Sequence, residues 1–193
     1  MEIGEETGAG GVDSETAQAG YDWKTSTEAR LGEDKHGRER PLHTSFVKLT
    51  IAWIGKTKSP AIQSLTDEYL KRLRQYAEVE GVAVKDGPAL LKLCGRDGRS
   101  TRRWLVLLDS RGKQLSSEGL ADFIREHQVH NPVPLLFAIG AADGFSEDFC
   151  RQADFVLSIG KMTLAHELAR VVLLEQVYRA FTILKGHPYH LGH

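Results

Sequence analysis

The residues with the clearest chemical potential gather near the C-terminus. A glycine-containing loop at residues 159–164 leads into a long amphipathic segment, and the tail His187-Pro188-Tyr189-His190 follows it. Histidine transfers protons near neutral pH, and a tyrosine ring offers a flat face for stacking. Arg170 and Arg179 lie between loop and tail, where they are either solvated or face a phosphate. We therefore expect this end of the chain to belong to a functional site.

Glycine-bearing loops also follow two earlier apolar segments. Residues 108–112 and 140–144 each come directly after a predicted strand, as residues 159–164 do. In open α/β sheets, ligands bind at the carboxyl ends of strands, and glycine lets the backbone approach a ligand closely. One such loop is no more than an ordinary turn. With three such loops in succession, a ligand site is as good an interpretation as three ordinary turns.

The same residues do not predict a metal site. The segment at residues 166–170 has the sequence H-E-L-A-R, which resembles half of a zinc protease motif. That motif needs a second histidine where this chain has Arg170, and a guanidinium does not ligate zinc. Cys94 and Cys150 lack C-x-x-C spacing, so we expect buried thiols in a reducing compartment.

Strands and helices alternate along the chain. Apolar, β-rich segments predict strands at residues 46–54, 79–84, 104–108, 134–139 and 155–159. Caps and helical periodicity predict helices that begin at Pro60, at Ser116 or Ser117, and at Ser146, and a last helix over residues 164–185. For residues 85–101 we expect a helix remnant or a loop. This alternation predicts an α/β domain with a largely parallel sheet.

Composition sets the outer limits. The chain has 193 residues, of which 41% are hydrophobic, enough for one domain with a real core. No apolar run is long enough to span a membrane and no apolar signal segment opens the chain, so we expect a soluble, cytoplasmic protein. Residues 1–43 hold 10 acidic and 5 basic residues, so their net charge is −5. The whole chain has a net charge of −1, so the remaining residues sum to +4. We expect this acidic leader to be disordered, and a mildly basic domain permits a polyanionic partner.

Four segments of the sequence resemble one known family. They are residues 47–56 (V-K-L-T-I-A-W-I-G-K), 107–121 (L-L-D-S-R-G-K-Q-L-S-S-E-G-L-A), 137–145 (F-A-I-G-A-A-D-G-F) and 157–190, which runs from L-S-I-G-K-M-T to H-P-Y-H. Together they are similar to the RlmH-type methyltransferases of the SPOUT superfamily. The resemblance covers about residues 46–190, and its last segment is long and specific.

The resemblance implies a fold and an activity. It implies one SPOUT domain over residues 44–193: a largely parallel sheet with helices on both faces and a C-terminal deep trefoil knot. It implies a homodimer that takes S-adenosylmethionine, without a metal, as methyl donor. It further implies methylation of N3 of a pseudouridine in 23S rRNA, within the large subunit or the whole ribosome, with no membrane partner.

The resemblance also implies roles for individual residues. Substrate or transfer positions match Arg179, Tyr189 and His190. Positions that contact the methyl donor match Leu108, Gly140, Ile159, Gly160, Lys161, Met162, Thr163 and Leu164. The chain departs from the family pattern at Ala141, where a second glycine is usual, at Gly160, where serine is usual, and at Ala165, where proline is usual.

The implied reaction assigns chemistry to the matched residues. The N3 proton of a uracil-like base must leave before or during attack on the methyl group. Arg179 is placed to stabilise the anionic base, and His190 or Tyr189 to accept the proton, with Tyr189 stacking on the base as the other option.

Two other functions stay open on the sequence alone. One is a SPOUT enzyme that methylates transfer RNA, although the H-P-Y-H tail favours ribosomal RNA. The other is a ribosome-binding module without a cofactor. Ala141 and Gly160 leave this alternative open, because both depart from the family pattern in the loops assigned to the methyl donor. A nucleotide hydrolase is excluded, because the chain has no Gly-x-x-x-x-Gly-Lys-Ser/Thr loop.

Overall fold

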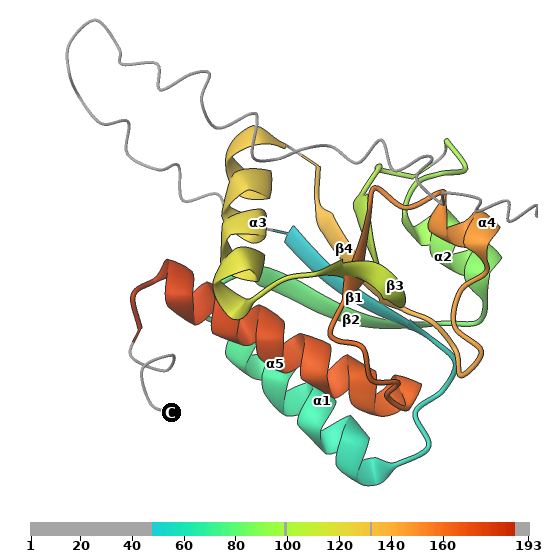
Figure 1. Ribbon diagram of the computed structural model, residues 1–193, viewed down its shortest axis with the longest axis horizontal. Coiled ribbons are helices and arrows are strands. Elements are labelled where there is room, and N and C mark those ends of the chain that lie inside the picture. The colour runs from blue at the N-terminus through green and yellow to red at the C-terminus, as the bar shows by residue number, and fades with distance from the viewer. Residues whose placement is uncertain (1–47, 99, 132, 188–193) are drawn as a thin grey trace, which may run out of the picture. The chain divides into compact units, whose positions relative to one another are not determined.

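The computed structural model describes residues 48–98, 100–131 and 133–187 (Figure 1). The predicted leader at residues 1–43 lies outside these residues, as do Tyr189 and His190 of the tail. No helix in the described ranges is long and apolar enough to cross a membrane.

Five strands form one parallel sheet. Their order across the sheet is β2-β1-β4-β3-β5, and each pair of neighbours runs in the same direction. The strands are β1 (Lys48–Ile54), β2 (Glu78–Val84), β3 (Trp104–Gln114), β4 (Leu135–Ile139) and β5 (Phe155–Ser158). The predicted α/β class and parallel sheet are thereby confirmed.

Helices cover both faces of this sheet. The three longer helices, α1, α3 and α5, pack on one face, whereas α2 and α4 pack on the other (Figure 1). The helices are α1 (Pro60–Leu73), α2 (Gly87–Leu93), α3 (Ser117–His130), α4 (Glu147–Cys150) and α5 (His166–Leu184). Helices on both faces exclude water from the whole middle of the sheet, as parallel sheets require.

The alternation of side chains in β1 explains the two hydrophobic cores. Leu49, Ile51 and Trp53 belong to the larger core under α1, α3 and α5, whereas Ala52 belongs to the smaller core under α2 and α4. All five residues of Leu135–Ile139 are buried, because β4 is the central strand and both its faces are covered. Successive strand residues point to opposite faces, so a continuous apolar run is what a central strand needs.

The structure resolves one expectation that the sequence left open, and it shifts the start of one helix. A short helix, α2, forms in the segment for which a helix remnant or a loop was expected, and the Asp86 side chain caps it by accepting from the Ala89 N–H at 2.9 Å. The last helix begins at His166 rather than at Leu164, so Leu164 stays in the loop before it. The carboxylate cap explains how so polar a segment starts a helix.

Strand β3 continues past the apolar run that predicted it. The prediction ended the strand at Leu108, but β3 extends to Gln114. Leu108 pairs with Leu157 of β5, and Lys113 pairs with Leu157 as well, with a register shift between them. The extension therefore bulges away from β5 and returns to it.

Gly112 marks the closest approach in that bulge. A Cβ at this position would lie 2.7 Å from backbone atoms of Val156 and Leu157. The two backbones touch where β3 passes β5, and a residue without a side chain is required there.

The buried Arg170 fits neither sequence expectation. It is 1% exposed, and its guanidinium carbon lies 4.3 Å from the centroid of the Trp53 ring. Its Nε and Nη2 have no hydrogen-bond partner among the described residues, and burial lowers its pKa. The guanidinium stays charged, since arginine loses its proton only far above neutral pH. Arg170 is thus a cation stacked inside the core, between α5 and the end of β1.

The crossing at Gly112 yields a stability prediction. Substituting Gly112→Ala should lower the free energy of unfolding by about 2–3 kcal/mol, because the new methyl group meets rigid backbone. The matched control is Gly119→Ala in α3, where a Cβ would have its nearest neighbour at 3.5 Å. That control should raise stability by up to about 1 kcal/mol through helix propensity. Urea unfolding of the three proteins measures both; equal stability of Gly112→Ala and the parent would contradict the close crossing.

Candidate active site

A cavity opens at the carboxyl ends of β3, β4 and β5. Its volume is about 400 Å³. Residues of three loops and of the first turn of α5 line it: Leu108, Asp109, Ser110, Arg111, Ile139, Gly140, Ala141, Ala142, Asp143, Gly144, Phe145, Ser158, Ile159, Gly160, Met162, Thr163, Leu164, His166 and Ala169. The three glycine-bearing loops singled out in the sequence therefore meet at one site.

Seven of the eight residues assigned to the methyl donor line this cavity. They are Leu108, Gly140, Ile159, Gly160, Met162, Thr163 and Leu164. Lys161, the eighth, is exposed and is not among the lining residues. The structure thus brings together segments that lie about 50 residues apart in the chain.

The first wall is the loop within β3. Asp109 accepts three hydrogen bonds from Arg111: from the backbone N–H at 3.0 Å, from Nε at 2.8 Å and from Nη2 at 2.9 Å. The Asp109 side chain is 9% exposed and that of Arg111 50%. A carboxylate and a guanidinium that meet through two pairs of atoms fix each other's orientation.

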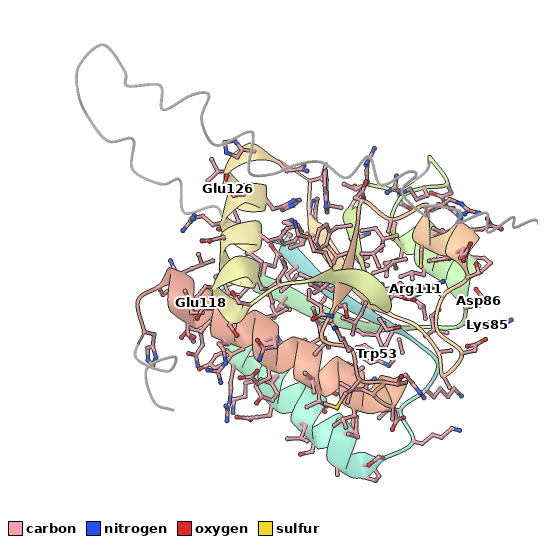
Figure 2. The ribbon with its side chains drawn as sticks, in the orientation of Figure 1. Trp53, Lys85, Asp86, Arg111, Glu118 and Glu126 are labelled. Carbon is pink, nitrogen blue, oxygen red and sulfur yellow. The ribbon has the colours of Figure 1, made fainter. Side chains whose placement is uncertain are left out.

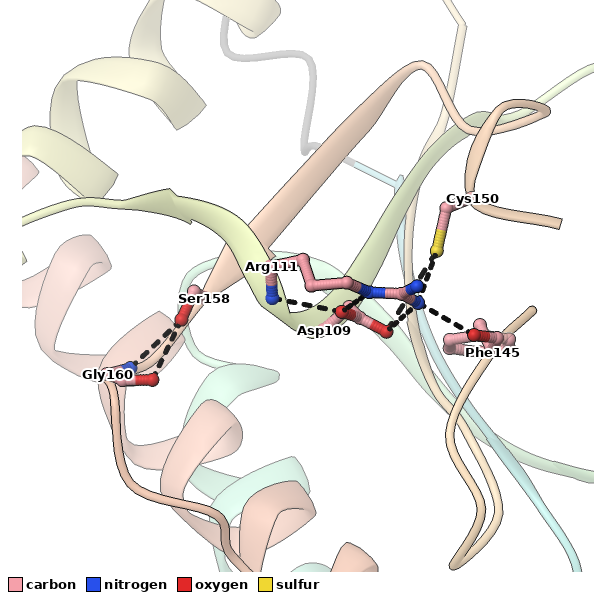
Figure 3. A network of polar contacts seen from close by, with 6 residues as sticks. All are labelled: Asp109, Arg111, Phe145, Cys150, Ser158 and Gly160. Carbon is pink, nitrogen blue, oxygen red and sulfur yellow. Dashed lines mark hydrogen bonds and ion pairs between the residues drawn. The ribbon is translucent and has the colours of Figure 1, made fainter. Parts of the chain in front are cut away.

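The second wall is the turn after β4. The Gly144 N–H donates to the Ala141 carbonyl at 3.0 Å, and Gly144 has a φ of 72°, which favours glycine. Arg111 reaches across and donates through Nη2 to the Phe145 carbonyl at 2.7 Å (Figure 3). The first two walls are therefore tied together by one side chain.

The third wall is the loop between β5 and α5. The Ser158 Oγ accepts from the Gly160 N–H at 3.2 Å and donates to the Gly160 carbonyl at 3.0 Å (Figure 3). At the start of α5, Glu167 accepts from the backbone N–H of Lys58 at 2.7 Å. These bonds hold the loop and the helix start in place beside the cavity.

Charge and burial shift the pKa of Asp109 in the first wall and of two cysteine thiols outside it. Arg111 holds the pKa of the Asp109 carboxyl below its ordinary value, chiefly through the hydrogen bonds between them. Burial raises the pKa of the Cys150 thiol, which lies 3.4 Å from Arg111 Nη2. Cys94 is fully buried, and its pKa is raised to about 11. Both thiols therefore stay protonated at neutral pH, as inert structural cysteines do.

Arg179 lies far from the cavity. It is thirteen residues beyond His166 on α5, or about 20 Å along the helix axis. Its Nε and Nη2 contact Glu175 Oε1 at 3.0 and 2.9 Å. Gln176 donates to the other Glu175 oxygen at 2.6 Å and accepts from Ser117 at 2.7 Å. The structure thus places Arg179 at the other end of the helix, beside the start of α3, while Tyr189 and His190 lie outside the described residues.

A family comparison decides the class of the protein. A family model described as a predicted SPOUT methyltransferase matches residues 47–190, about three quarters of the chain. The chain belongs to this family.

The relatives of this SPOUT methyltransferase agree with the RlmH-type resemblance. Ribosomal RNA large subunit methyltransferase H of Koribacter versatilis is 57% identical over 147 residues, covering 76% of this chain and all of the relative. The protein of that name in Geobacter sulfurreducens is 41% identical over 154 residues, covering 75% of this chain and 99% of the relative. Among solved structures, the SpoU methyltransferase AviRb from Streptomyces viridochromogenes, in complex with AdoMet, has a TM-score of 0.46 at 17% identity, covering 74% of this chain and 60% of that one. The SPOUT class and the RlmH type are confirmed by the family model and the first two relatives.

Part of this cavity could not be assigned from the sequence. The loops at residues 108–112 and 140–144 were candidates for a ligand site, but Asp109, Arg111 and Phe145 had no predicted role. An acidic residue and an arginine two positions apart, directly after a buried strand, are a visible signal. The contact of Arg111 with a carbonyl 34 residues away is not visible in sequence. Among the residues that the structure describes, no group of three or more His, Cys, Asp or Glu side chains is arranged to hold a metal.

The pair in the first wall predicts a pH-dependent stability. Because the folded pKa of Asp109 is depressed, its ion pair stabilises the fold above the ordinary carboxyl pKa, and this contribution is lost as pH falls through the folded value. Asp109→Asn should therefore unfold more easily than the parent by about 1 kcal/mol at pH 7, and the gap should narrow as pH falls below the ordinary carboxyl pKa.

Urea unfolding at pH 7, 5 and 3 measures that gap. Asp143→Asn removes an exposed carboxylate of the same cavity and serves as the control, with little change at any pH. A gap for Asp109→Asn that stays constant over this range would contradict the ion pair.

Proposed function

We propose that this chain transfers a methyl group from S-adenosylmethionine to N3 of a pseudouridine in 23S rRNA. The observation that carries the proposal is the cavity, because it gathers seven of the eight residues that the RlmH resemblance assigns to the methyl donor. The relatives named ribosomal RNA large subunit methyltransferase H supply the substrate class. We place the reaction in the cytoplasm, on the assembled ribosome.

The residues present fit the methyl donor. A volume of about 400 Å³ falls within the range of small-molecule sites. At Gly144 and Gly160 a Cβ would meet no atom within 4 Å, so bare backbone faces the open space. The donor, when bound, supplies an electrophilic methyl group on a sulfonium sulfur. Gly160 departs from the usual serine, and its backbone is already held by Ser158.

The protein's own task is to position the base and handle one proton. Methyl transfer is an in-line displacement, for which orientation supplies most of the help. The N3 proton must leave, and His190 or Tyr189 is the candidate acceptor. Arg179 is the candidate to stabilise the anionic base. Glu175 holds Arg179 in place and orients its guanidinium.

The position of Arg179 indicates how many copies of the chain contribute residues to one active site. About 20 Å of helix separates it from the start of α5, and an arginine side chain does not bridge that distance. Its role at the reacting base therefore requires the cavity of a second copy. We propose a homodimer in which the C-terminal end of one chain serves the cavity of the other.

A patch of exposed apolar side chains supports the homodimer. Leu65 on α1 and Leu168 on α5 are each 44% exposed, and Ile159 and Met162 before α5 are 37% and 83% exposed. The two helices pack side by side, with the Tyr69 and Tyr178 rings 6.2 Å apart, as members of one layer. Exposed apolar patches of this kind mark interaction surfaces.

We also propose that the C-terminal segment is knotted as the resemblance implies. The support is the path of β3, which pairs with Leu157 at both Leu108 and Lys113 and touches the β5 backbone at Gly112. We infer that the chain leading into α5 passes through the loop that this path forms. A knotted path is rare among folds, and the cavity loops then hold one another in place.

The proposed activity predicts the product of a labelling experiment. Purified protein with radiolabelled S-adenosylmethionine should label 23S rRNA, with ribosomes labelled faster than free rRNA. Mass mapping should find one methyl group at N3 of one pseudouridine. Label on transfer RNA would instead indicate the other SPOUT function, and calorimetry without S-adenosylmethionine binding would indicate a ribosome-binding module.

The same assay separates the roles of the tail residues. Under single turnover, His190→Ala should slow methyl transfer by about 100-fold if His190 accepts the proton, and Tyr189→Phe should slow it similarly if Tyr189 does. Tyr189→Phe keeps a stacking ring, so it tests the hydroxyl alone. Normal rates for both variants would exclude the tail from the chemistry.

The apolar patch predicts a dimer-weakening substitution. Leu168→Glu should raise the dimer dissociation constant at least about tenfold, because a carboxylate would be buried against apolar surface. Val129→Glu is the matched control, since Val129 is a 57% exposed residue of α3 outside the patch. Light scattering across a concentration series measures both; equal dimer strength in the two variants would place the interface elsewhere.

A further inference from the structure

The Asp109–Arg111 pair stands where two walls of the cavity leave the sheet. Pairing between β3 and β4 ends at Leu108 and Ile139. Beyond that point the bond from Arg111 Nη2 to the Phe145 carbonyl, at 2.7 Å, joins the two loops (Figure 3). Figure 2 shows Arg111 on the side of the sheet that α2 and α4 cover. The width of the cavity between these loops therefore depends on where the Arg111 guanidinium lies.

Asp109 determines that position. It holds the backbone N–H of Arg111 and two of its guanidinium nitrogens, so the side chain folds back over its own loop. Asp109 is almost fully enclosed, whereas half of the Arg111 side chain is exposed. Both residues line the cavity. Such a pair presents almost no net charge to a ligand.

Charge neutrality matters because the methyl donor is a cation and its product is not. A lone guanidinium beside the cavity would repel a sulfonium, and a lone carboxylate would attract it. Either imbalance would change the preference of the cavity between the donor and S-adenosylhomocysteine, which lacks the sulfonium charge.

We propose that Asp109 and Arg111 form a positioning clasp for the methyl donor: Arg111 sets the spacing of two cavity walls through the Phe145 carbonyl, and Asp109 cancels its charge. This inference rests on the proposed function, because it assumes that the cavity takes S-adenosylmethionine. It adds two residues that the family resemblance did not assign to the site.

The test is calorimetric titration of the full chain with S-adenosylmethionine and with S-adenosylhomocysteine. Arg111→Met should weaken both ligands about tenfold through loss of the wall contact, as expected for a hydrogen bond from a charged group. It should also move the preference about fivefold toward the cationic donor, because Asp109 is then unbalanced. Asp109→Asn should move the preference about fivefold the other way.

Two further variants keep the test sharp. Arg111→Lys keeps the charge but loses the two-pronged contact, so it should weaken both ligands and leave the preference near that of the parent. Arg151→Met is the matched control, since Arg151 is an exposed arginine on the end of α4 that pairs with Asp148 and does not line the cavity. It should bind both ligands within about twofold of the parent.

Folding failure is separated from loss of function by a neutral double variant. Asp109→Asn with Arg111→Met leaves no unpaired charge, so it should fold, bind both ligands weakly and recover the parental preference. In the methylation assay, the KM of this double variant for S-adenosylmethionine should rise, while its KM for ribosomes stays unchanged. Opposite movements of the preference in the two single variants support the clasp, and an unchanged preference in both overturns it. If the parent itself binds neither ligand, the proposed function fails and the clasp fails with it.

Discussion

The rest of the structure depends on the contact between two backbones at Gly112. Only a residue without a side chain lets β3 pass Val156 and Leu157 at that distance, and only that passage lets β3 leave β5 and return to it. The bulge created there carries Asp109 and Arg111 into the cavity. The same crossing brings the loop after β5 beside the loop within β3. One steric constraint thus sets the spacing of two cavity walls before any ligand binds.

The interior of the fold could be predicted from sequence, because continuous apolar runs indicate buried strands. The strands at residues 104–108 and 134–139 were found in this way, and the glycines that follow strands marked the cavity loops. The extension of β3 to Gln114 could not be found, since its residues are polar and its stability comes from pairing with Leu157 and Ser158. Arg170 was misjudged for a related reason. Sequence gives its charge, but the Trp53 ring that covers it comes from a strand more than 100 residues earlier.

The candidate site likewise has a part that could be predicted from sequence and a part that could not. The family resemblance assigned eight residues to the methyl donor from a motif, which is a local property of the chain, and seven of them line one cavity of the structure. Asp109 and Arg111 are close in sequence, but the bond from Arg111 to the Phe145 carbonyl joins residues 34 positions apart and is recognised only in the folded chain. Arg179 illustrates the limit of a motif match, since the match suggests a role for a residue but does not give its position in the fold. The length of α5 separates Arg179 from the cavity of the same chain.

The position of α5 in the core also governs when the protein folds. Leu173, Leu174, Val177 and Phe181 are at most 3% exposed and complete the larger core between α1 and α3. These residues follow α1, α3 and the five strands of the sheet in the chain, so they are synthesised after them. Until then the apolar faces of α1, α3 and the sheet have no cover, so the nascent chain holds an open core. Folding of this domain is therefore completed only after translation has passed α5, and a chain truncated before α5 should be a client of chaperones.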